Sequence, residues 1–332
     1  MRKTILQSLL VYGIAAVIVW YVARDVSWVQ ILRTMSHATL WLLLVASLGG
    51  FLCWFIGETF LFSRLFSYFH GRTGAMELLP TVAMVYFLQI INSLVAGGAF
   101  VLFLHTRKRV PWIAGGCTMM FQSYVDIMLL AILSLIAMDL VPSSPIRPGL
   151  GYAAGVLGAI VLITGFWLFW EPRPGFGKWL RWLYERPSMV SFRMARPSHY
   201  LRLMAIRVLI FIGAGFALYG QFVSFHIKVP LIQVLALTPF VLAIGNAPIS
   251  PAGIGTTQLV FTVGFAHFAS KDALMAVSLA ATAFNFLFRI PMGFVSGPSL
   301  VDEIAEAKRE LTTGHHDQVG ADQHRVSADA EP

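Results

Sequence analysis

The chain has 332 residues, of which 57% are hydrophobic and only 12% are charged. Soluble domains carry roughly a quarter of charged residues, so this composition excludes a soluble globular protein and indicates an all-α polytopic membrane protein. The net charge of +8 comes largely from loops beside apolar stretches, a placement that favours contact with membrane surfaces over nucleic-acid binding.

Nine apolar stretches follow one another along the chain, and the longer ones can cross a hydrocarbon core of about 30 Å as helices. The first begins after a basic start, as in a signal peptide, but no small-residue cleavage site follows it, so we expect an uncleaved span. Cys53 and Cys117 fall inside apolar stretches and indicate neither a disulfide framework nor a metal site. The stretches are 5–23, 38–62, 78–104, 112–138, 149–170, 203–225, 230–247, 256–269 and 273–299.

The basic residues argue against a topology in which every stretch crosses. In that topology the loops 107–109 and 173–202 would both lie outside, against the positive-inside rule. If 78–104 and 230–269 instead enter and return as re-entrant hairpins, six spans remain and both termini are cytoplasmic. Seventeen basic residues then lie inside, and the five outside are Arg24, Arg33, Arg147, Lys228 and Lys271.

The two predicted hairpins each contain a break in the apolar pattern. The first break is "INSLVAGGAF" (91–100) and the second is "NAPISPAGIGTTQ" (246–258). Exposed backbone groups are costly in hydrocarbon, so such breaks should face protein or a polar cavity. Simple kinked spans are the alternative interpretation, because membrane helices tolerate Pro and Gly.

The hairpins divide a single transmembrane domain, 1–301, into two similar halves, 5–138 and 149–299. Each half consists of two spans, a hairpin and a third span. Because each half crosses the membrane three times, the second half starts on the opposite side and is inverted relative to the first. The segments "FQSYVDIM" (121–128) and "FNFLFRIP" (284–291) echo one another after the two hairpins. Inverted repeats with interrupted helices are typical of transporters. The tail, 302–332, loses apolar periodicity and is expected to be disordered in the cytoplasm.

Few ionisable residues lie at membrane depth, where they are candidates for a functional site. Asp126 and Arg289 occupy the echo positions, and we hypothesise an ion pair between them. Glu58 and Arg207 fall near the cytoplasmic boundary, where we expect them to reach water. Neutral polar residues gather around the hairpins and either line a cavity or hydrogen-bond between helices: Gln89, Asn92, Gln122, Asn246, Ser250, Gln258 and Asn285.

Two further patterns concern contacts with lipid and with other helices. The segment "GYAAGVLG" (151–158) has small residues on one face and predicts close helix packing, within the chain or between protomers. The segment "FGKWLRWLYER" (176–186) alternates basic and aromatic residues, typical of an interfacial helix. We expect the loop 173–202 to contact anionic lipid headgroups.

Motifs of catalysis are missing. The sequence has no phosphate-binding Gly-rich loop ending in Lys-Ser/Thr, no His-Glu-x-x-His helix and no Gly-x-Ser-x-Gly turn. We therefore predict no enzyme activity, no catalytic residues, no cofactor and no metal site.

The second break carries a family resemblance. "NAPISPAGIGTTQL" resembles the signature of the lysylphosphatidylglycerol synthase transmembrane-region family, the flippase-like domains of bacterial integral membrane proteins. "INSLVAGGAF" with its following basic loop, and "FLFRIPMGFVSG" (286–297), are also similar to that family. Compared with the family, charged residues are replaced at three places here: Ala99 or Phe100 stands for a Glu, Gln122 and Ser123 stand for Glu-Arg, and Gln258 stands for a Glu.

The resemblance implies a flippase-like transporter in the bacterial cytoplasmic (inner) membrane. It would move a lipid or other amphiphile between leaflets through a central cavity at the hairpin tips. A non-transporting scaffold or accessory subunit of a lipid-modifying system is the alternative, and an intramembrane enzyme is a third. Membrane lipids are the expected partners; a homo-oligomer or a lipid-modifying enzyme partner stays open. The candidate substrate-binding residues are Asn92, Gly97, Gly98, Gln122, Asp126, Asn246, Pro248, Ser250, Pro251, Gly253, Gly255, Gln258, Asn285 and Arg289.

Overall fold

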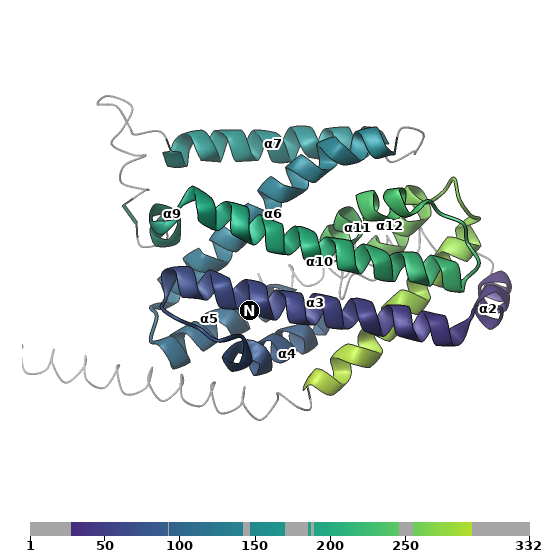
Figure 1. The fold of residues 1–332 in the computed structure, drawn as a ribbon, viewed down its shortest axis with the longest axis horizontal. Helices are drawn as coiled ribbons and strands as arrows, with labels where there is room; N and C mark the ends of the chain where they lie inside the picture. Colours follow the sequence, from purple (N-terminus) through teal and green to yellow (C-terminus); the bar gives the residue numbers. More distant parts are fainter. Residues whose placement is uncertain are drawn as a thin grey trace, which may run out of the picture.

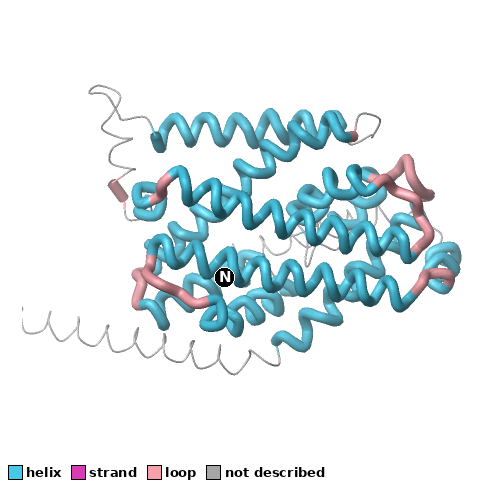
Figure 2. The backbone as a smooth tube through the Cα atoms, in the orientation of Figure 1, coloured by secondary structure: helices cyan, strands magenta, loops and turns pink. Residues whose placement is uncertain are grey.

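The structure, a computed structural model, describes residues 28–91, 93–141, 147–169, 185–186, 189–245 and 255–293. In this part of the chain every regular element is a helix, as Figure 2 shows. The prediction of an all-α polytopic membrane protein is confirmed. Four predicted features lie outside the described residues: the first span 5–23, most of the interfacial segment 176–186, the motif residues 246–254 and the tail 302–332.

Five described helices are long and apolar enough to cross a membrane (Figure 1). The longest, α3 and α10, have 30 and 28 residues, and thus run about 45 and 42 Å at ~1.5 Å per residue. Both extend beyond the apolar stretches that predicted them, α3 at its C-terminal end and α10 at its N-terminal end. The five are α3 (Leu40–Phe69), α6 (Trp112–Leu140), α7 (Arg147–Phe169), α10 (Pro197–Ser224) and a final helix, Lys271–Gly293.

Six shorter helices complete the described part. The apolar stretch 78–104 forms two helices, α4 (Ala75–Ile91) and α5 (Ser93–Lys108). The segment 230–269 likewise contains α11 (Leu231–Gly245) and α12 (Thr256–Gly264). The sequence did not lead us to expect α2 (Trp28–Ser36) or α9 (Val190–Met194), which lie outside the long apolar runs.

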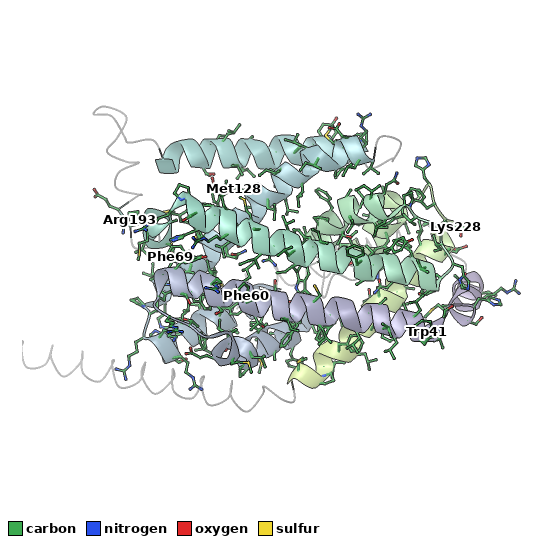
Figure 3. All side chains as sticks on the ribbon, viewed as in Figure 1. Trp41, Phe60, Phe69, Met128, Arg193 and Lys228 are labelled. Carbon is green, nitrogen blue, oxygen red and sulfur yellow. The ribbon has the colours of Figure 1, made fainter. Side chains whose placement is uncertain are left out.

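The two ends of the helix bundle are fixed by contacts between distant segments. At one end the Thr39 amide, just before α3, donates to the carbonyl of Ser224 at the end of α10 (2.8 Å). At the other, His70 after α3 hydrogen-bonds Thr118 of α6 (2.6 Å). Figure 3 shows Lys228 at the first end and Arg193 at the second. We call the second the basic end, because these residues lie there: Arg72, Arg107, Lys108, Arg109, Arg193 and Arg196.

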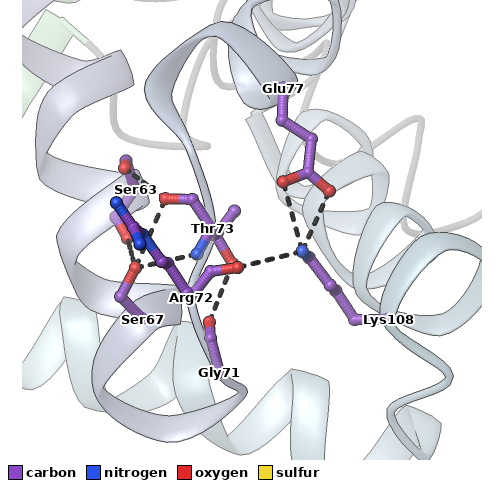
Figure 4. Close-up of polar contacts among 7 residues, drawn as sticks. All are labelled: Ser63, Ser67, Gly71, Arg72, Thr73, Glu77 and Lys108. Carbon is purple, nitrogen blue, oxygen red and sulfur yellow. Dashed lines mark hydrogen bonds and ion pairs between the residues drawn. The ribbon is translucent and has the colours of Figure 1, made fainter.

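The pair α4–α5 begins and finishes at the basic end. Lys108 Nζ at the close of α5 lies 2.9 Å from Glu77 Oε1 in the first turn of α4 (Figure 4). The same ammonium group donates to the Arg72 carbonyl (3.2 Å). With 17 and 16 residues, each helix is about 25 Å long, short of the ~30 Å core. The chain therefore enters and returns at one end, the geometry expected for a hairpin.

The outer ends of the pair α11–α12 lie at the opposite end of the bundle. It follows α10 directly, and Phe265 beyond α12 packs on Phe222 near the end of α10, with ring centroids 4.7 Å apart. The two helix pairs thus open to opposite ends of the bundle, and lie toward opposite ends of the long helices in Figure 1. The relation of the two halves as an inverted repeat stays a prediction.

Glycines bring α3 and α10 close together along their length. A Cβ on Gly57 would lie 2.5 Å from Ile210 Cγ1, and one on Gly50 would lie 2.6 Å from the Ala217 Cβ. On α10, Gly213 faces Cys53, and a Cβ on Gly220 would lie 2.8 Å from the Ala46 Cβ. Small residues that allow backbones to approach are the usual basis of helix association in membranes. This contact between α3 and α10 holds the centre of the bundle.

The predicted small-residue stripe, by contrast, makes little contact within the described chain. A Cβ on Gly151 would lie 3.4 Å from Met138, whereas Gly155 and Gly158 have no described neighbour within 4 Å of that position. On the same helix, α7, Tyr152 and Leu162 are exposed. Packing of this stripe between protomers stays a prediction.

Candidate functional site

A cavity of about 190 Å³ lies inside the bundle. Its walls come from α3, α4, α10, α11, α12 and the final helix, so both helix pairs contribute to it. One part of the lining is aromatic and apolar, including Phe51, Trp54, Tyr86, Phe261 and Phe288. The polar lining consists of Ser47, Gln89, Gln221, Thr238, Thr257, Thr282, Asn285 and Arg289. A space with both characters can accept a polar group that is attached to an apolar one.

Arg289 brings the charge to this cavity. Its side chain comes from the final helix and is buried, with 7% of its surface exposed. The guanidinium carbon lies over the Tyr86 ring, 5.2 Å from the centroid. Its Nε is buried and has no hydrogen-bond partner among the described residues. A buried cation in this state retains hydrogen-bonding capacity that the described protein does not use.

Two more buried polar atoms without a partner belong to the same lining. They are the Tyr86 hydroxyl and the Gln89 Oε1, and both residues lie on α4 one turn apart. Nearly all buried polar groups in proteins are hydrogen-bonded, so unpaired groups call for a partner. All three belong to residues that line one cavity, although the atoms themselves have almost no accessible surface.

A second charged cluster lies beside the cavity without lining it. Arg207 of α10 donates from Nε and Nη2 to the two oxygens of Asp126 on α6, at 2.9 and 3.0 Å. Its Nη1 donates to Glu58 Oε1 on α3 at 2.9 Å. Gln122 also donates to Asp126 (3.0 Å). This Glu58–Arg207–Asp126 triad ties three spanning helices together by charge-assisted hydrogen bonds.

The triad corrects two expectations from the sequence. The hypothesised pair between Asp126 and Arg289 is wrong, because Asp126 is bound by Arg207 in a two-pronged contact. Glu58 and Arg207 do not reach out to water: they are 7% and 5% exposed and bind each other. Both residues stand on the long helices α3 and α10, and the close glycine-mediated contact of those helices brings the two side chains together.

Comparison with known proteins decides the family. The family model of the lysylphosphatidylglycerol synthase transmembrane region matches residues 5–293. The chain belongs to this family. No curated protein matches the chain. The family match covers all the described helices and, together with the apolar helices, shows an integral multi-pass membrane protein.

The cavity includes two of the candidate substrate-binding residues, Asn285 and Arg289 on the final helix, and also Gln89 of the polar set expected around the hairpins. It also includes Gly245 and Thr257, which flank the family motif on either side. The motif residues Asn246, Pro248, Ser250, Pro251 and Gly253 lie outside the described residues, as does Asn92.

The other predicted site residues lie elsewhere. Gln122 supports the triad through Asp126. Gln258 Oε1 accepts from the Gly255 amide (2.6 Å), and its Nε2 donates to Thr282 (3.2 Å). Gly255 and Gln258 therefore mark the start of α12, and Gln258 also joins it to the final helix. Gly255 has φ +91°, a backbone conformation that favours glycine. Gly97 and Gly98 in α5 do not line the cavity in the described structure.

Several lining residues escaped the sequence reading. Ser47 accepts a hydrogen bond from Gln221 (3.1 Å), which places both on the contact between α3 and α10. Thr238 and Thr282 each donate to the carbonyl four residues earlier. Such bonds are common in membrane helices, so a single Ser or Thr carries no signal of a cavity.

Proposed function

We propose that this protein is a flippase-like transporter that moves a lipid or another amphiphile between bilayer leaflets through the cavity around Arg289. The observation that carries the proposal is the cavity itself. It lies among apolar helices, one side of its lining is aromatic, and its polar side includes the charged Arg289 together with Gln89 and Asn285. A headgroup could occupy the polar part while its acyl chains stay in the bilayer.

The helix pairs supply a means of access from each side. Tyr86 and Gln89 of α4 line the cavity, and so do Thr238 of α11 and Phe261 of α12. Since the pairs open to opposite ends of the bundle, movement of one pair would open the cavity toward one leaflet and movement of the other toward the second. Alternating access around a fixed central site is the common mechanism of transporters with interrupted helices.

The charge distribution supports an orientation. The basic end carries most of the described basic loop residues, while Arg33, Arg147, Lys228 and Lys271 belong to the opposite end. By the positive-inside rule the basic end faces the cytoplasm. We place both termini on that side, in the bacterial inner membrane, and we propose transport without an enzymatic step.

Lipid movement in reconstituted liposomes tests the function. Phosphatidylglycerol, phosphatidylethanolamine and phosphatidylcholine, each with a fluorescent acyl chain, would be followed by dithionite quenching of the outer leaflet. Ala281 lines the cavity, so Ala281→Phe should fill it and stop movement. Leu287, on the same helix, is 57% exposed on the outside of the bundle, and Leu287→Phe should leave the rate unchanged.

Two results would overturn the proposal. One is a wild-type rate equal to that of protein-free liposomes for all three probes, which would favour the scaffold or accessory-subunit alternative. The other is an unchanged rate in a folded Ala281→Phe protein, which would place any lipid movement outside the cavity.

A further inference from the structure

We propose that the short helix α9 is a lid at the basic end of the bundle, and that it leaves its seat on α6 during lipid movement. In this structure the lid is closed. The opening of the lid is inferred from the contacts of α9 alone, whereas its part in lipid movement rests on the proposed function.

α9 is set into the bundle and does not lie on its surface. The ring centroid of Phe192 is 5.4 Å from that of Phe121 and 5.7 Å from that of Tyr124, both on α6. Phe121 comes nine residues after Trp112, where α6 begins at the basic end, and this spacing is about 14 Å along a helix. At such a depth a segment outside the long helices is stable only when protein or a water-filled space surrounds it.

The rings behind Phe192 close the junction of three spanning helices. Phe121 packs on Phe69 at the end of α3 and on Tyr200 at the start of α10, with centroids 5.1 and 4.9 Å apart. Phe192 adds a further ring to this cluster from the side of α9. The cluster therefore separates the basic end from the part of the bundle that holds the triad.

A partly exposed charge lies beyond this cluster. Asp126 comes five residues after Phe121 on α6, and its side chain is 31% exposed although Arg207 binds it. A carboxylate inside a membrane domain is costly in hydrocarbon and is found facing protein or water. The exposed part of Asp126 thus calls for a polar space inside the domain, and an open lid would connect that space with the basic end.

Buried hydrogen bonds hold α9 on its seat. Ser191 and Thr118 of α6 have no exposed surface, and their hydroxyl oxygens lie 2.9 Å apart. Thr118 is also hydrogen-bonded to His70 Nε2 after the end of α3 (2.6 Å). The Ser191 amide donates to the sulfur of Cys117 (3.4 Å). Water can replace the bonds of Ser191 when α9 leaves, so their net contribution is modest.

The shape of α9 favours local opening over unfolding of the bundle. The helix has five residues, and its outer side is exposed, with Met194 51% exposed. Extended backbone at Ala195 and Arg196 joins it to α10. Short segments with one buried face open at lower free energy than long packed helices. A permanent anchor is the alternative, in which α9 leaves only when the whole bundle unfolds.

The native Cys117 can report the opening. It is 1% exposed and lies under Ser191, and Cys53→Ala removes the other cysteine of the chain. The full chain in liposomes would be treated with a charged, water-soluble methanethiosulfonate reagent. We expect Cys117 to react faster than the bundle unfolds, the unfolding rate being extrapolated to zero SDS from tryptophan fluorescence.

A variant and its control assign the reaction to α9. Phe192→Ala removes the ring that packs on Phe121 and Tyr124, so it should speed labelling of Cys117 by about tenfold or more. Leu201→Ala truncates a side chain that is 68% exposed at the start of α10, and it should leave the labelling rate unchanged. Both variants would first be checked for an unchanged unfolding midpoint.

A disulfide between the lid and its seat tests the role in transport. Ser191→Cys places a second thiol next to Cys117, and an added oxidant should join the two sulfurs, as mass spectrometry would verify. In the liposome assay the oxidised protein should lose lipid movement, and reduction should restore it. Ser191→Cys combined with Cys117→Ala cannot form the bond, so the oxidant should not change its rate.

The outcomes separate the lid from the proposed function. Labelling of Cys117 only at the rate of global unfolding, without acceleration in folded Phe192→Ala protein, would overturn the lid and make α9 a fixed anchor. Undiminished lipid movement with the disulfide formed would overturn its role in transport. A wild type that moves no lipid but shows faster labelling in Phe192→Ala would contradict the proposed function and still support the lid.

Discussion

Arg207 and Arg289 are both buried guanidinium groups in the membrane domain, but their surroundings differ. Arg207 makes three hydrogen bonds to two carboxylates from two other helices. Arg289 stacks on Tyr86, faces a cavity and has an Nε without a described partner. Their exposures are 5% and 7%, so burial alone does not separate them. The difference is whether the described protein satisfies the charge, and on this basis we propose a structural role for Arg207 and a ligand-binding role for Arg289.

Replacing each arginine by methionine should give the largest contrast. Arg207→Met leaves Glu58 and Asp126 buried without their counter-charge, and breaking a buried ion pair in this way costs about 3–5 kcal/mol. Arg289→Met removes a charge that the protein does not satisfy, so we expect a change within about 1 kcal/mol. Unfolding in mixed detergent and SDS, followed by tryptophan fluorescence, measures both free energies.

Single carboxylate variants and a combined variant control this experiment. The side chain of Glu58 is 9% exposed and that of Asp126 is 31% exposed, so Glu58→Gln should destabilise more than Asp126→Asn. The triple variant Glu58→Leu, Asp126→Leu, Arg207→Met should recover much of the loss, because no uncompensated charge remains. A loss in Arg289→Met as large as that in Arg207→Met would contradict the distinction between the two sites.

A glycine next to the triad should give the second largest effect. A Cβ on Gly57 would lie 2.5 Å from Ile210 Cγ1, so Gly57→Ala must push α3 and α10 apart beside Glu58 and Arg207. Overpacking of this kind costs about 1–3 kcal/mol. Gly49→Ala on the same helix meets no described atom within 4 Å and gains the same helix propensity. The difference in unfolding free energy between the two variants isolates the packing effect; equal stabilities would show that this close contact does not constrain the triad.

The sequence was sufficient for the long helices and for the division of 78–104 into two, but not for α2, α9 or the pairing of charges. Long apolar runs, the Gly-containing break after Ile91 and the basic loop 107–109 predicted helices that the structure contains. These signals are local, because they depend on hydrophobic length and loop charge. The partner of Asp126 is not local: it is 81 residues away on α10. Sequence echo suggested Arg289, whereas the packing of α3 against α10 selected Arg207.

The cavity shows the same limit. Arg289 and Asn285 stood out because polar residues are rare in membrane spans. Tyr86 did not, because a tyrosine in an apolar helix is ordinary. Its place in the cavity lining against Arg289 is something that only the arrangement of α3, α4 and the final helix determines.

The ion pair at the mouth of the α4–α5 pair should give the smallest effect. Lys108 and Glu77 have the same 2.9 Å contact as the triad, but their side chains are 18% and 41% exposed. Water and salt screen such a pair, so Glu77→Gln should cost only about 0.2–1 kcal/mol. The cost should fall further at high ionic strength, because a pair at the surface is screened. A salt titration of the unfolding free energy measures this for the wild type and the variant.

Lys108→Met provides the matched variant, because Lys108 also donates to the Arg72 carbonyl between α3 and α4. Its removal should therefore cost slightly more than Glu77→Gln, and that extra loss should persist in high salt, since the carbonyl carries no net charge. If both costs instead resisted salt and approached those of the triad, the pair would act as a buried one. The entry point of α4–α5 would then be closed to water. Solvent exposure would in that case not explain the difference between this pair and the Glu58–Arg207–Asp126 triad.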